Sequence, residues 1–431
     1  MQIIKYPERS EWEQILARPS IDVSSLTATV VEILNDIKTK GDRAVIEYEA
    51  KFDNAELKEL VVSESEINAS ESLVSQDLKE AILSAKANIK KFHANQVFES
   101  RKIETTQGVT CWQKAVAIEK VGLYIPGGTA PLFSTVLMLA IPAKIAGCRE
   151  IVLCTPPDGD GNINPAILYA AKVSGVSRIF KAGGVQAIGA MAYGTESVPK
   201  VYKIFGPGNQ YVMAAKQIVS LRDVAIDMPA GPSEVQIIAD DTADVTFIAS
   251  DLLSQAEHGG DSQVILTTTS EKLIAEVEEE VERQTKELPR CAIAEKALTN
   301  SRLVLLKDDD EIIEMTNEYA PEHLIIETDN YMSFADRVIN AGSIFLGHYT
   351  PESAGDYASG TNHTLPTSGY AKAYSGVNLD SFIKKITFQH ISKEGINNLG
   401  KTIETMAENE QLFAHKNAVT LRLKKIEEKK Q

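Results

Sequence analysis

The sequence contains little cysteine, few aromatic residues and no long apolar run. Its four cysteines, Cys111, Cys148, Cys154 and Cys291, show neither CxxC spacing nor a disulfide framework. No apolar stretch approaches the roughly 20 residues of a membrane-spanning helix. The N-terminal segment is polar and lacks the apolar centre of a signal peptide. We therefore expect a soluble, cytoplasmic protein with reduced thiols.

Positive charge is also scarce. The 431 residues include 44 Lys and Arg against 60 Asp and Glu, which gives a formal net charge of −16. This balance disfavours binding to nucleic acid or to anionic membranes, because both attract basic surfaces. Hydrophobic residues make up 43% of the chain and charged residues 24%, as in a folded globular protein. At this length we expect about two to three domains.

Two series of alternating strand and helix patterns follow a mainly helical N-terminal part. The first series starts near residue 115 and has strands at 121–125, 151–154, 178–181 and 201–205. The second starts after a Pro/Gly-rich break at 228–232 and has strands at 234–238, 263–267, 302–306, 323–327 and 343–346. Repeated βα units predict mostly parallel, doubly wound sheets. We expect two α/β domains with a ligand site in the cleft between them.

The sequence lacks the GxGxxG fingerprint of dinucleotide-binding folds. Three glycine-rich turns nevertheless follow strands of the first series: Gly127-Gly128-Thr129, Gly183-Gly184 and Gly206-Pro207-Gly208. A turn of this kind that leads into a helix can bind a pyrophosphate through backbone N–H groups. Each turn alone is equally typical of a tight turn, but three on one sheet favour a nucleotide site.

One predicted helix ends with two side chains of the kind that bind metal ions. Gln255 and His258 are three residues apart, so they share a face of the last helical turn. The free carbonyls and the negative end of the helix dipole favour a cation there. Two ligands do not hold a metal ion, so the remaining ligands must come from other segments.

Other candidate residues lie in three separate segments. Glu322 and His323 are an adjacent acid and imidazole at the start of a strand, which suits acid/base chemistry, although spacing alone slightly favours ordinary surface roles. Asp356 and His363 lie in a long predicted loop at 348–374 that is rich in Gly, Ser, Thr and Pro, where ligand and solvated positions fit the pattern equally well. His415 lies in the last predicted helix, where a structural role is the simpler interpretation.

Three alternative functions remain open on the residues alone. Cys148 could be the nucleophile of an aldehyde dehydrogenase, although a cysteine at the end of an apolar helix is usually packed. A two-lobed binding protein for a small amine or imidazole would also have two α/β domains. A zinc hydrolase would carry an HExxH helix, which the sequence lacks.

Several of these motifs, in their order and separation, resemble the histidinol dehydrogenase family. They are the segments around Asn209, Gln255, Glu322 and Asp356, together with Tyr124-Ile125-Pro126-Gly127-Gly128 and Gly231-Pro232-Ser233-Glu234. The likeness extends from about residue 20 to the C-terminus. It implies a zinc-dependent enzyme of histidine biosynthesis that oxidises L-histidinol through L-histidinaldehyde to L-histidine and reduces two NAD⁺.

The resemblance also implies roles for particular residues. Zinc, one ion per subunit, would be held by Gln255, His258, Asp356 and His415, the last from the partner subunit of a homodimer. NAD would contact Tyr124, Gln186 and Asn209. The catalytic pair would be Glu322 and His323. The substrate would contact Ser233, Gln255, His258, His323, Asp356, Tyr357, Glu410 and His415.

The expected fold is α/β, with two Rossmann-like doubly wound parallel-sheet domains that lack a standard GxGxxG. Residues 1–20 would form an N-terminal tail. Residues 21–114 and 232–375 would form the first α/β domain, which includes the helical N-terminal segment and carries most metal and catalytic residues. Residues 115–231 would form the second, NAD-binding α/β domain. Residues 376–431 would form a small C-terminal dimer arm that completes the partner subunit's site.

Overall fold

The computed structural model describes residues 1–19, 23–127, 130–229 and 231–429. It divides into two compact units, described separately below. The larger comprises Met1–Gln96 and Ile118–Phe382, and the smaller comprises Val97–Ala117 and Ile383–Gln431. Parts of five expected features lie outside the described residues: residue 20 of the tail, residues 21–22 of the first α/β domain, Gly128 and Thr129 of the first glycine-rich turn, Ala230 of the Pro/Gly break, and residues 430–431 of the C-terminal arm.

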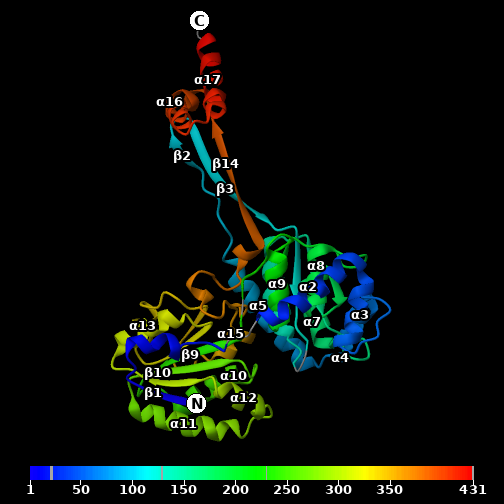
Figure 1. Ribbon diagram of the computed structural model, residues 1–431, viewed down its shortest axis with the longest axis vertical. Helices are drawn as coiled ribbons and strands as arrows, with labels where there is room; N and C mark the ends of the chain where they lie inside the picture. The colour runs from blue at the N-terminus through cyan, green and yellow to red at the C-terminus, as the bar shows by residue number, and fades with distance from the viewer. Residues whose placement is uncertain (20–22, 128–129, 230, 430–431) are drawn as a thin grey trace. The chain divides into compact units, whose positions relative to one another are not determined.

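A five-stranded parallel sheet carries the first βα series of the larger unit (Figure 1). Its strands lie in the order β6 (Arg178–Lys181), β5 (Glu150–Thr155), β4 (Lys120–Tyr124), β7 (Lys203–Phe205) and β8 (Ala225–Ile226). The connecting helices are α6 (Phe133–Ala146), α7 (Pro165–Ser174), α8 (Gly184–Tyr193) and α9 (Gln210–Ser220). The predicted alternation of strands and helices is confirmed. Strand order reverses beside β4, which creates a crevice at the carboxyl ends of the strands.

The N-terminal helices pack on the helices of this five-stranded sheet. They are α2 (Val23–Lys40), α3 (Asp42–Phe52), α4 (Glu64–Leu73) and α5 (Gln76–Ala94). Helix α2 contacts α8 and α9, α3 contacts α8, α4 contacts α7, and α5 contacts α6. This packing corrects the expectation that residues 21–114 belong with residues 232–375. The reason is that α8 is buried along its length, so it needs the apolar side chains of Ile33, Leu34 and Ile37 as a cover.

A six-stranded parallel sheet carries the second series. Its order is β1 (Gln2–Lys5), β11 (Arg302–Leu305), β10 (Gln263–Thr268), β9 (Glu234–Ala239), β12 (His323–Glu327) and β13 (Ser343–Leu346). The accompanying helices are α10 (Val245–Ala256), α11 (Glu271–Thr285), α12 (Cys291–Leu298), α13 (Asp309–Tyr319) and α14 (Tyr331–Ala335). Helix α12 was not expected, and α14 is shorter than predicted.

The expected N-terminal tail is part of this sheet. Strand β1 pairs with β11 along its whole length and forms the sheet edge. It is followed by the 3-10 turn η1 (Arg9–Glu11) and the short helix α1 (Trp12–Ile15), whose buried Trp12 and Ile15 join the core beneath α13. The tail is therefore corrected to an ordered edge element. Its strand is too short and too exposed to give an alternating pattern in the sequence.

The predicted long loop at 348–374 is partly helical. Helix α15 (Glu352–Tyr357) lies within it, and the short 3-10 helices η2 (Tyr370–Lys372) and η3 (Leu379–Phe382) follow. The segment between α15 and η2 buries Thr364, Leu365 and Thr367. It is a packed connection rather than a solvated loop.

The smaller unit is an antiparallel sheet with two helices. Its strand order is β14 (Ile383–Ile391), β3 (Val109–Ala117) and β2 (Ile103–Thr106), so the N-terminal part of the chain is not only helical. Helices α16 (Lys393–Asn409) and α17 (Phe413–Glu428) pack against each other. The unit exposes several large apolar side chains, among them Ile103, Ile386, Met406, Phe413 and Leu421.

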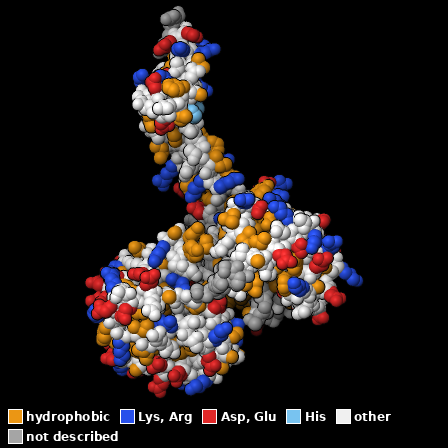
Figure 2. Space-filling model, in the orientation of Figure 1, with side chains coloured by type: hydrophobic (Ala, Val, Ile, Leu, Met, Phe, Trp, Pro, Cys, Tyr) orange, Lys and Arg blue, Asp and Glu red, His pale blue; other side chains and the backbone are white. Residues whose placement is uncertain are grey.

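Acidic side chains gather over α11 and α13 on the surface of the larger unit (Figure 2). Asp309 and Asp310 at the start of α13 are exposed, as is Glu279 in α11. This distribution fits the formal net charge of −16. Among the described helices, none combines the length and apolar character needed to span a bilayer.

Candidate active site

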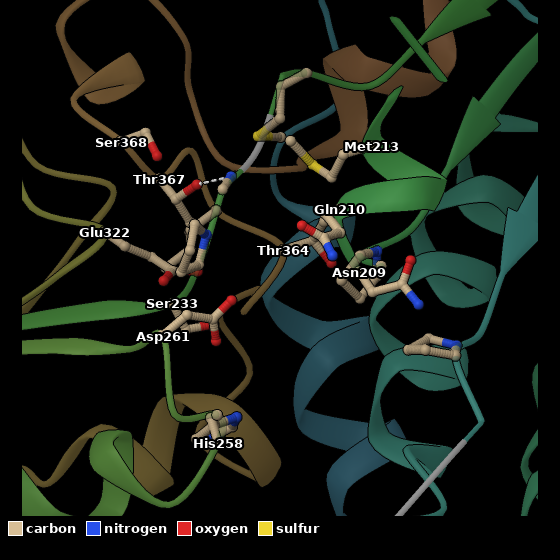
Figure 3. Close-up of a pocket in the computed structure, with 18 of the residues that line it drawn as sticks. Asn209, Gln210, Met213, Ser233, His258, Asp261, Glu322, Thr364, Thr367 and Ser368 are labelled. Atoms are coloured by element: carbon tan, nitrogen blue, oxygen red, sulfur yellow. Dashed lines mark hydrogen bonds between the residues drawn. The ribbon is translucent and has the colours of Figure 1, made fainter. Parts of the chain in front are cut away.

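A cavity of about 650 Å³ lies between the two α/β parts of the larger unit. One wall comes from the turn after β7 and the start of α9, with Asn209, Gln210 and Met213; the other carries Ser233, His258 and Glu322 (Figure 3). The first wall is at the carboxyl end of β7, whereas Glu322 and Ser233 precede β12 and β9. The expected cleft is therefore present, but the six-stranded sheet contributes to it through the amino ends of its strands.

His323 is the first residue of β12 and is 4% exposed. Its Nδ1 lies 3.3 Å from the carbonyl oxygen of Glu234. Because a carbonyl only accepts, this contact favours the tautomer with hydrogen on Nδ1. Nε2 has no hydrogen-bond partner among the described residues and lies 3.6 Å from Oδ1 of Asp356. Nε2 is thus the ring nitrogen available to accept a proton.

Three carboxylates surround the His323 ring. Its Nδ1 lies 3.7 Å from Oε2 of Glu322 and 3.8 Å from Oε1 of Glu352, and Asp356 faces Nε2. Burial alone would lower the pKa of His323, but Glu352, Glu322 and Asp356 together raise it well above its usual value. Burial also raises the pKa of Glu322 to about 8, with His323 and the N–H of Glu234 opposing the shift. An acid with such a pKa is suited to proton transfer near neutrality.

His258, Glu352 and Asp356 form a candidate metal centre. One ligand atom from each lies within 4.8 Å of the others. Glu352 and Asp356 are one turn apart on α15, so both carboxylates face the same side. His258 follows the end of α10 and is exposed toward the cavity, yet the packing around its other sides lowers the pKa of its imidazole, which favours the neutral form a metal requires.

The chemistry of these side chains fits a cation such as zinc. Oδ1 of Asp356 is buried and has no hydrogen-bond partner among the described residues, and imidazole with carboxylate oxygens is a usual zinc donor set. Gln255, at the end of α10, contacts Glu352. With its nitrogen toward Glu352 the amide donates to that carboxylate, and its oxygen accepts from the Glu234 N–H at 3.0 Å. In the opposite orientation two oxygens face each other, which is favourable only with a cation between them.

The residues expected at NAD are distributed over two places. Asn209 lines the cavity, and its side chain caps α9 by accepting from the N–H groups of Tyr211 and Val212 at 3.0 and 3.1 Å. Tyr124 ends β4 and Gln186 lies in the first turn of α8; both are buried, and neither is among the residues that line the cavity.

The glycine-rich turn before α8 is already bonded to side chains of the chain. The Gly183 N–H donates to Oε1 of Glu49 at 2.7 Å, and the Gly184 N–H donates to the Tyr124 hydroxyl at 3.1 Å. Gln186 also donates to Oε1 of Glu49, at 2.8 Å. A carboxylate from α3 thus occupies the helix start where a pyrophosphate could otherwise bind.

The turn before α9 is held by a buried ion pair. Nζ of Lys216 lies 2.5 Å from Oδ1 of Asp227, and their side chains are 4% and 2% exposed. Lys216 also donates to the Gly206 carbonyl at 2.8 Å, and the Gly206 N–H donates to Asp227 at 2.8 Å. Gly206 has φ +128°, and a Cβ there would lie 2.1 Å from the Tyr124 carbonyl oxygen, so only glycine fits.

The other expected site residues are placed as follows. Ser233 lines the cavity, and Tyr357 ends α15 with an exposed side chain. His363 is fixed at both ring nitrogens: it contacts the Asp356 carbonyl at 2.9 Å and the Thr135 hydroxyl at 3.1 Å. Glu410 is the C-cap residue that follows α16, and His415 lies in the first turn of α17; both are exposed and both are in the smaller unit.

Cys148 is not a plausible nucleophile. It is 5% exposed, and burial raises the pKa of its thiol to about 12. Since the thiolate is the reactive form, this cysteine is an inert packed residue. The packed interpretation is confirmed.

Two features of the site were missed in the sequence. Glu352 lies four residues before Asp356, a spacing that would have indicated a shared helix face if the segment had been recognised as a helix. Arg18 lines the cavity although it was assigned to the tail. No local pattern distinguishes it from a surface arginine.

Known proteins resemble this chain over nearly its whole length. A family model described as histidinol dehydrogenase matches residues 16–423. Histidinol dehydrogenase of Bacteroides thetaiotaomicron is 69% identical over 423 residues, covering 98% of this chain and 99% of that protein. The Escherichia coli (strain K12) enzyme of that name is 54% identical over 418 residues, covering 96% and 95%. A crystal structure of histidinol dehydrogenase from Elizabethkingia anophelis has a TM-score of 0.97 and 57% identity and covers 99% of both chains.

Proposed function

The chain belongs to the histidinol dehydrogenase family, and we propose that its cavity oxidises L-histidinol through L-histidinaldehyde to L-histidine with reduction of two NAD⁺. It is an oxidoreductase of histidine biosynthesis. The observation that carries the detailed proposal is the buried Glu322–His323 pair beside the cluster of His258, Glu352 and Asp356. That arrangement supplies a proton acceptor, a second carboxylate and a cation site next to one cavity.

Zinc would be held by Gln255, His258 and Asp356 together with His415 from a partner subunit. Glu352 either adds a ligand or orients Gln255, which it contacts. Bound zinc would orient the imidazole and amine of the substrate, and bound NAD⁺ would accept the hydride. The positive charge would also offset the carboxylates that raise the pKa of His323. His323 would then be a base near neutral pH.

His323 acts as the general base in both oxidations. The Nδ1–H donates to the Glu234 carbonyl and holds the ring in place. Nε2 takes the hydroxyl proton of L-histidinol as hydride leaves the carbon that bears this hydroxyl and passes to NAD⁺. The aldehyde remains in the cavity. Glu322 takes a proton from water as the water oxygen bonds to the aldehyde carbon, and protonated His323 returns its proton to the carbonyl oxygen, which gives the hydrate and leaves His323 neutral. His323 then accepts a hydroxyl proton of the hydrate as the second hydride leaves.

The remaining expected contacts extend this proposal. Ser233 and Tyr357 would bind substrate from this subunit, and Glu410 from the arm. Asn209 would bind NAD at the cavity, with Tyr124 and Gln186 shaping the neighbouring turn. Residues 115–231 would thus form the NAD-binding domain, and residues 232–375 would carry most of the catalytic residues.

We also propose that residues 376–431, which from Ile383 onward belong to the smaller unit, form the arm of a homodimer that completes the partner subunit's site. The observation that supports it is the exposed apolar side chains Met406, Phe413 and Leu421, which are 61%, 62% and 57% exposed. A second copy of the chain is the partner that could cover them.

The experiment that tests the proposal separates the two oxidations. Wild-type enzyme should form two NADH per L-histidinol, read by absorbance. Glu322→Gln should slow oxidation of L-histidinaldehyde by about 100- to 10,000-fold, the usual contribution of a general base, and affect alcohol oxidation much less. Equal loss in both steps would exclude Glu322 as the group that activates water. A wild-type yield of one NADH would exclude the second oxidation.

A further inference from the structure

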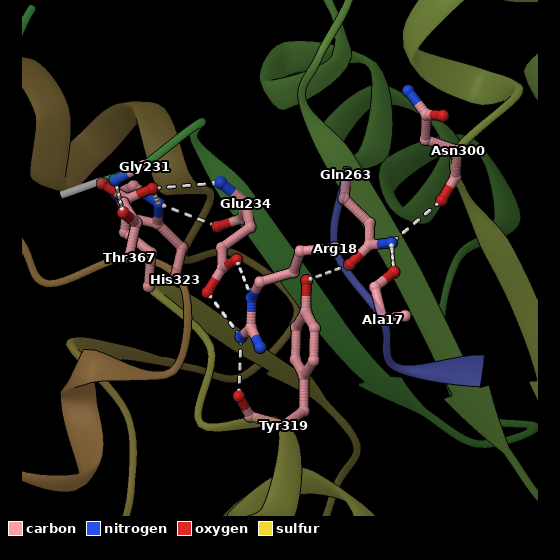
Figure 4. Close-up of polar contacts among 10 residues, drawn as sticks. Ala17, Arg18, Gly231, Glu234, Gln263, Asn300, Tyr319, His323 and Thr367 are labelled. Carbon is pink, nitrogen blue, oxygen red and sulfur yellow. Dashed lines mark hydrogen bonds and ion pairs between the residues drawn. The ribbon is translucent and has the colours of Figure 1, made fainter. Parts of the chain in front are cut away.

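A buried ion pair fixes the amino end of β9, next to the proposed catalytic residues. Glu234, the first residue of β9, is 1% exposed, and its carboxylate accepts from Nε of Arg18 at 2.5 Å and from Nη2 at 2.8 Å (Figure 4). The side chain of Arg18 is 19% exposed. Two parallel N–H bonds to one carboxylate define the orientation of both groups.

Arg18 binds a second segment at the same time. Its Nη2 donates to the Tyr319 carbonyl at 2.6 Å, and its guanidinium lies over the Tyr319 ring, 4.1 Å from the centroid. Tyr319 ends α13, and Ala320 then takes φ +52° and turns the chain toward Glu322. Arg18 therefore cross-links the start of β9 to the turn that delivers Glu322 and His323.

The position of Arg18 is itself fixed by the six-stranded sheet. Gln263 in β10 donates to the Ala17 carbonyl at 3.0 Å and accepts from the Tyr319 hydroxyl at 2.9 Å. Its amide also donates to the Asn300 carbonyl at 3.0 Å. These bonds hold both the backbone beside Arg18 and the ring beneath its guanidinium, so the cross-link is rigid.

The backbone of Glu234 contacts both members of the catalytic pair. Its N–H donates to Oε2 of Glu322 at 3.0 Å, and its carbonyl lies 3.3 Å from Nδ1 of His323. One peptide segment thus orients the carboxylate and selects the imidazole tautomer. A shift of this segment would move both groups together.

We propose that Arg18 and Glu234 are positioning residues of the dehydrogenase reaction. They hold the Glu322 carboxylate and the His323 imidazole in their relative orientation through the backbone of Glu234. The inference rests on the proposed function for what the pair does, but the placement of Glu322 can be tested without it. Lysine cannot replace Arg18, because a single ammonium cannot bond both Glu234 oxygens and the Tyr319 carbonyl in this planar arrangement.

The test compares Arg18→Met and Arg18→Lys with the matched control Arg9→Met. Arg9 lies on the same N-terminal segment, pairs with Glu314 of α13 and stacks on Trp12, but it is exposed and is not among the residues lining the cavity. We expect Arg18→Met to lower kcat by about 10- to 100-fold, as small displacements of reacting groups do. KM for NAD should stay within about twofold, Arg18→Lys should be intermediate, and Arg9→Met should match wild type. Equal effects of Arg18→Met and Arg9→Met would overturn the inference.

A double variant separates positioning from stability. Arg18→Met with Glu234→Gln removes both buried charges, so Tm should return toward the wild-type value. Since the cross-link is still missing, kcat should stay low. Recovery of kcat together with Tm would mean that the pair is only structural.

A crystal structure of Arg18→Met gives a readout that needs no activity. The Glu322 carboxylate should leave the Glu234 N–H, and an unmoved carboxylate would refute the inference. Failure of the proposed function is seen elsewhere, in the NADH yield of the wild type.

Discussion

Replacing Lys216 by methionine leaves the carboxylate of Asp227 buried without its counter-charge. Methionine keeps most of the apolar stem of lysine, so the change removes the ammonium and its two contacts, to Asp227 at 2.5 Å and to the Gly206 carbonyl at 2.8 Å. Asp227 would still accept from the Gly206 and Met228 N–H groups. Breaking a buried pair by removing one partner typically destabilises a protein by about 3–5 kcal/mol.

Lys120→Met is the matched control for this variant. Lys120 and Glu150 form an ion pair in the same five-stranded sheet, with N and O 3.2 Å apart, but their side chains are 35% and 23% exposed. Solvent screens such a pair, so its loss should reduce the free energy of unfolding by at most about 1 kcal/mol. The double variant Lys216→Met with Asp227→Asn should recover much of the stability lost by Lys216→Met alone.

Urea unfolding and steady-state kinetics give two independent readouts. The unfolding midpoint reports stability. Because the pair binds both polar groups of the Gly206 backbone beside Asn209, KM for NAD should also rise, while NADH yield per L-histidinol stays unchanged. A Lys216→Met variant no less stable than Lys120→Met would refute the reasoning. An unchanged KM would show that the pair does not shape the nucleotide site.

Two further predictions concern buried carboxylates. Burial first, and then the nearby charge of Asp251, raise the pKa of Glu327 from 4.5 to about 8. The folded state therefore binds the Glu327 proton more tightly than the unfolded state does. The free energy of unfolding falls as pH rises between these two values. Glu327→Gln removes the effect; its Tm relative to wild type should therefore increase from about pH 6 to about pH 9, and a constant difference would contradict this. Glu352→Gln should weaken zinc binding by about 10- to 100-fold in competition with a chelator, and unchanged affinity would exclude Glu352 from the site.

The α/β architecture was predictable because each βα unit has a recognisable pattern within a short stretch of sequence. A buried parallel strand such as β5 contains a short continuous apolar run, Ile151–Cys154, and the helices between the strands have caps and apolar faces that a short window reveals. The packing partner of a helix is not local information. Helix α2 has an apolar stripe, but the stripe does not indicate whether α2 packs on α8 or on a helix of the six-stranded sheet.

The site residues likewise divide into those with a local sequence signal and those without one. Glu322–His323 and Gln255 with His258 were found because they are close in the sequence, and the other expected residues came from family likeness. Glu352 was missed because its helix has only six residues and lies in a segment rich in turn formers. Arg18 was missed because its partner, Glu234, is more than 200 positions away, and only folding reveals that the pair is buried.

Buried carboxylates near the cavity fall into two groups, those paired with a cation of this chain and those without one. Glu234 and Asp227 are buried carboxylates with their own cations, Arg18 and Lys216, so each is complete within the chain. Around Glu352 the groups that act most strongly after burial are the His323 imidazole and further carboxylates, including Asp356. One imidazole cannot neutralise several carboxylates, and unpaired buried charge is strongly unfavourable. The cluster therefore requires either bound protons or a cation, and a divalent ion would satisfy it while leaving His323 free to accept a proton.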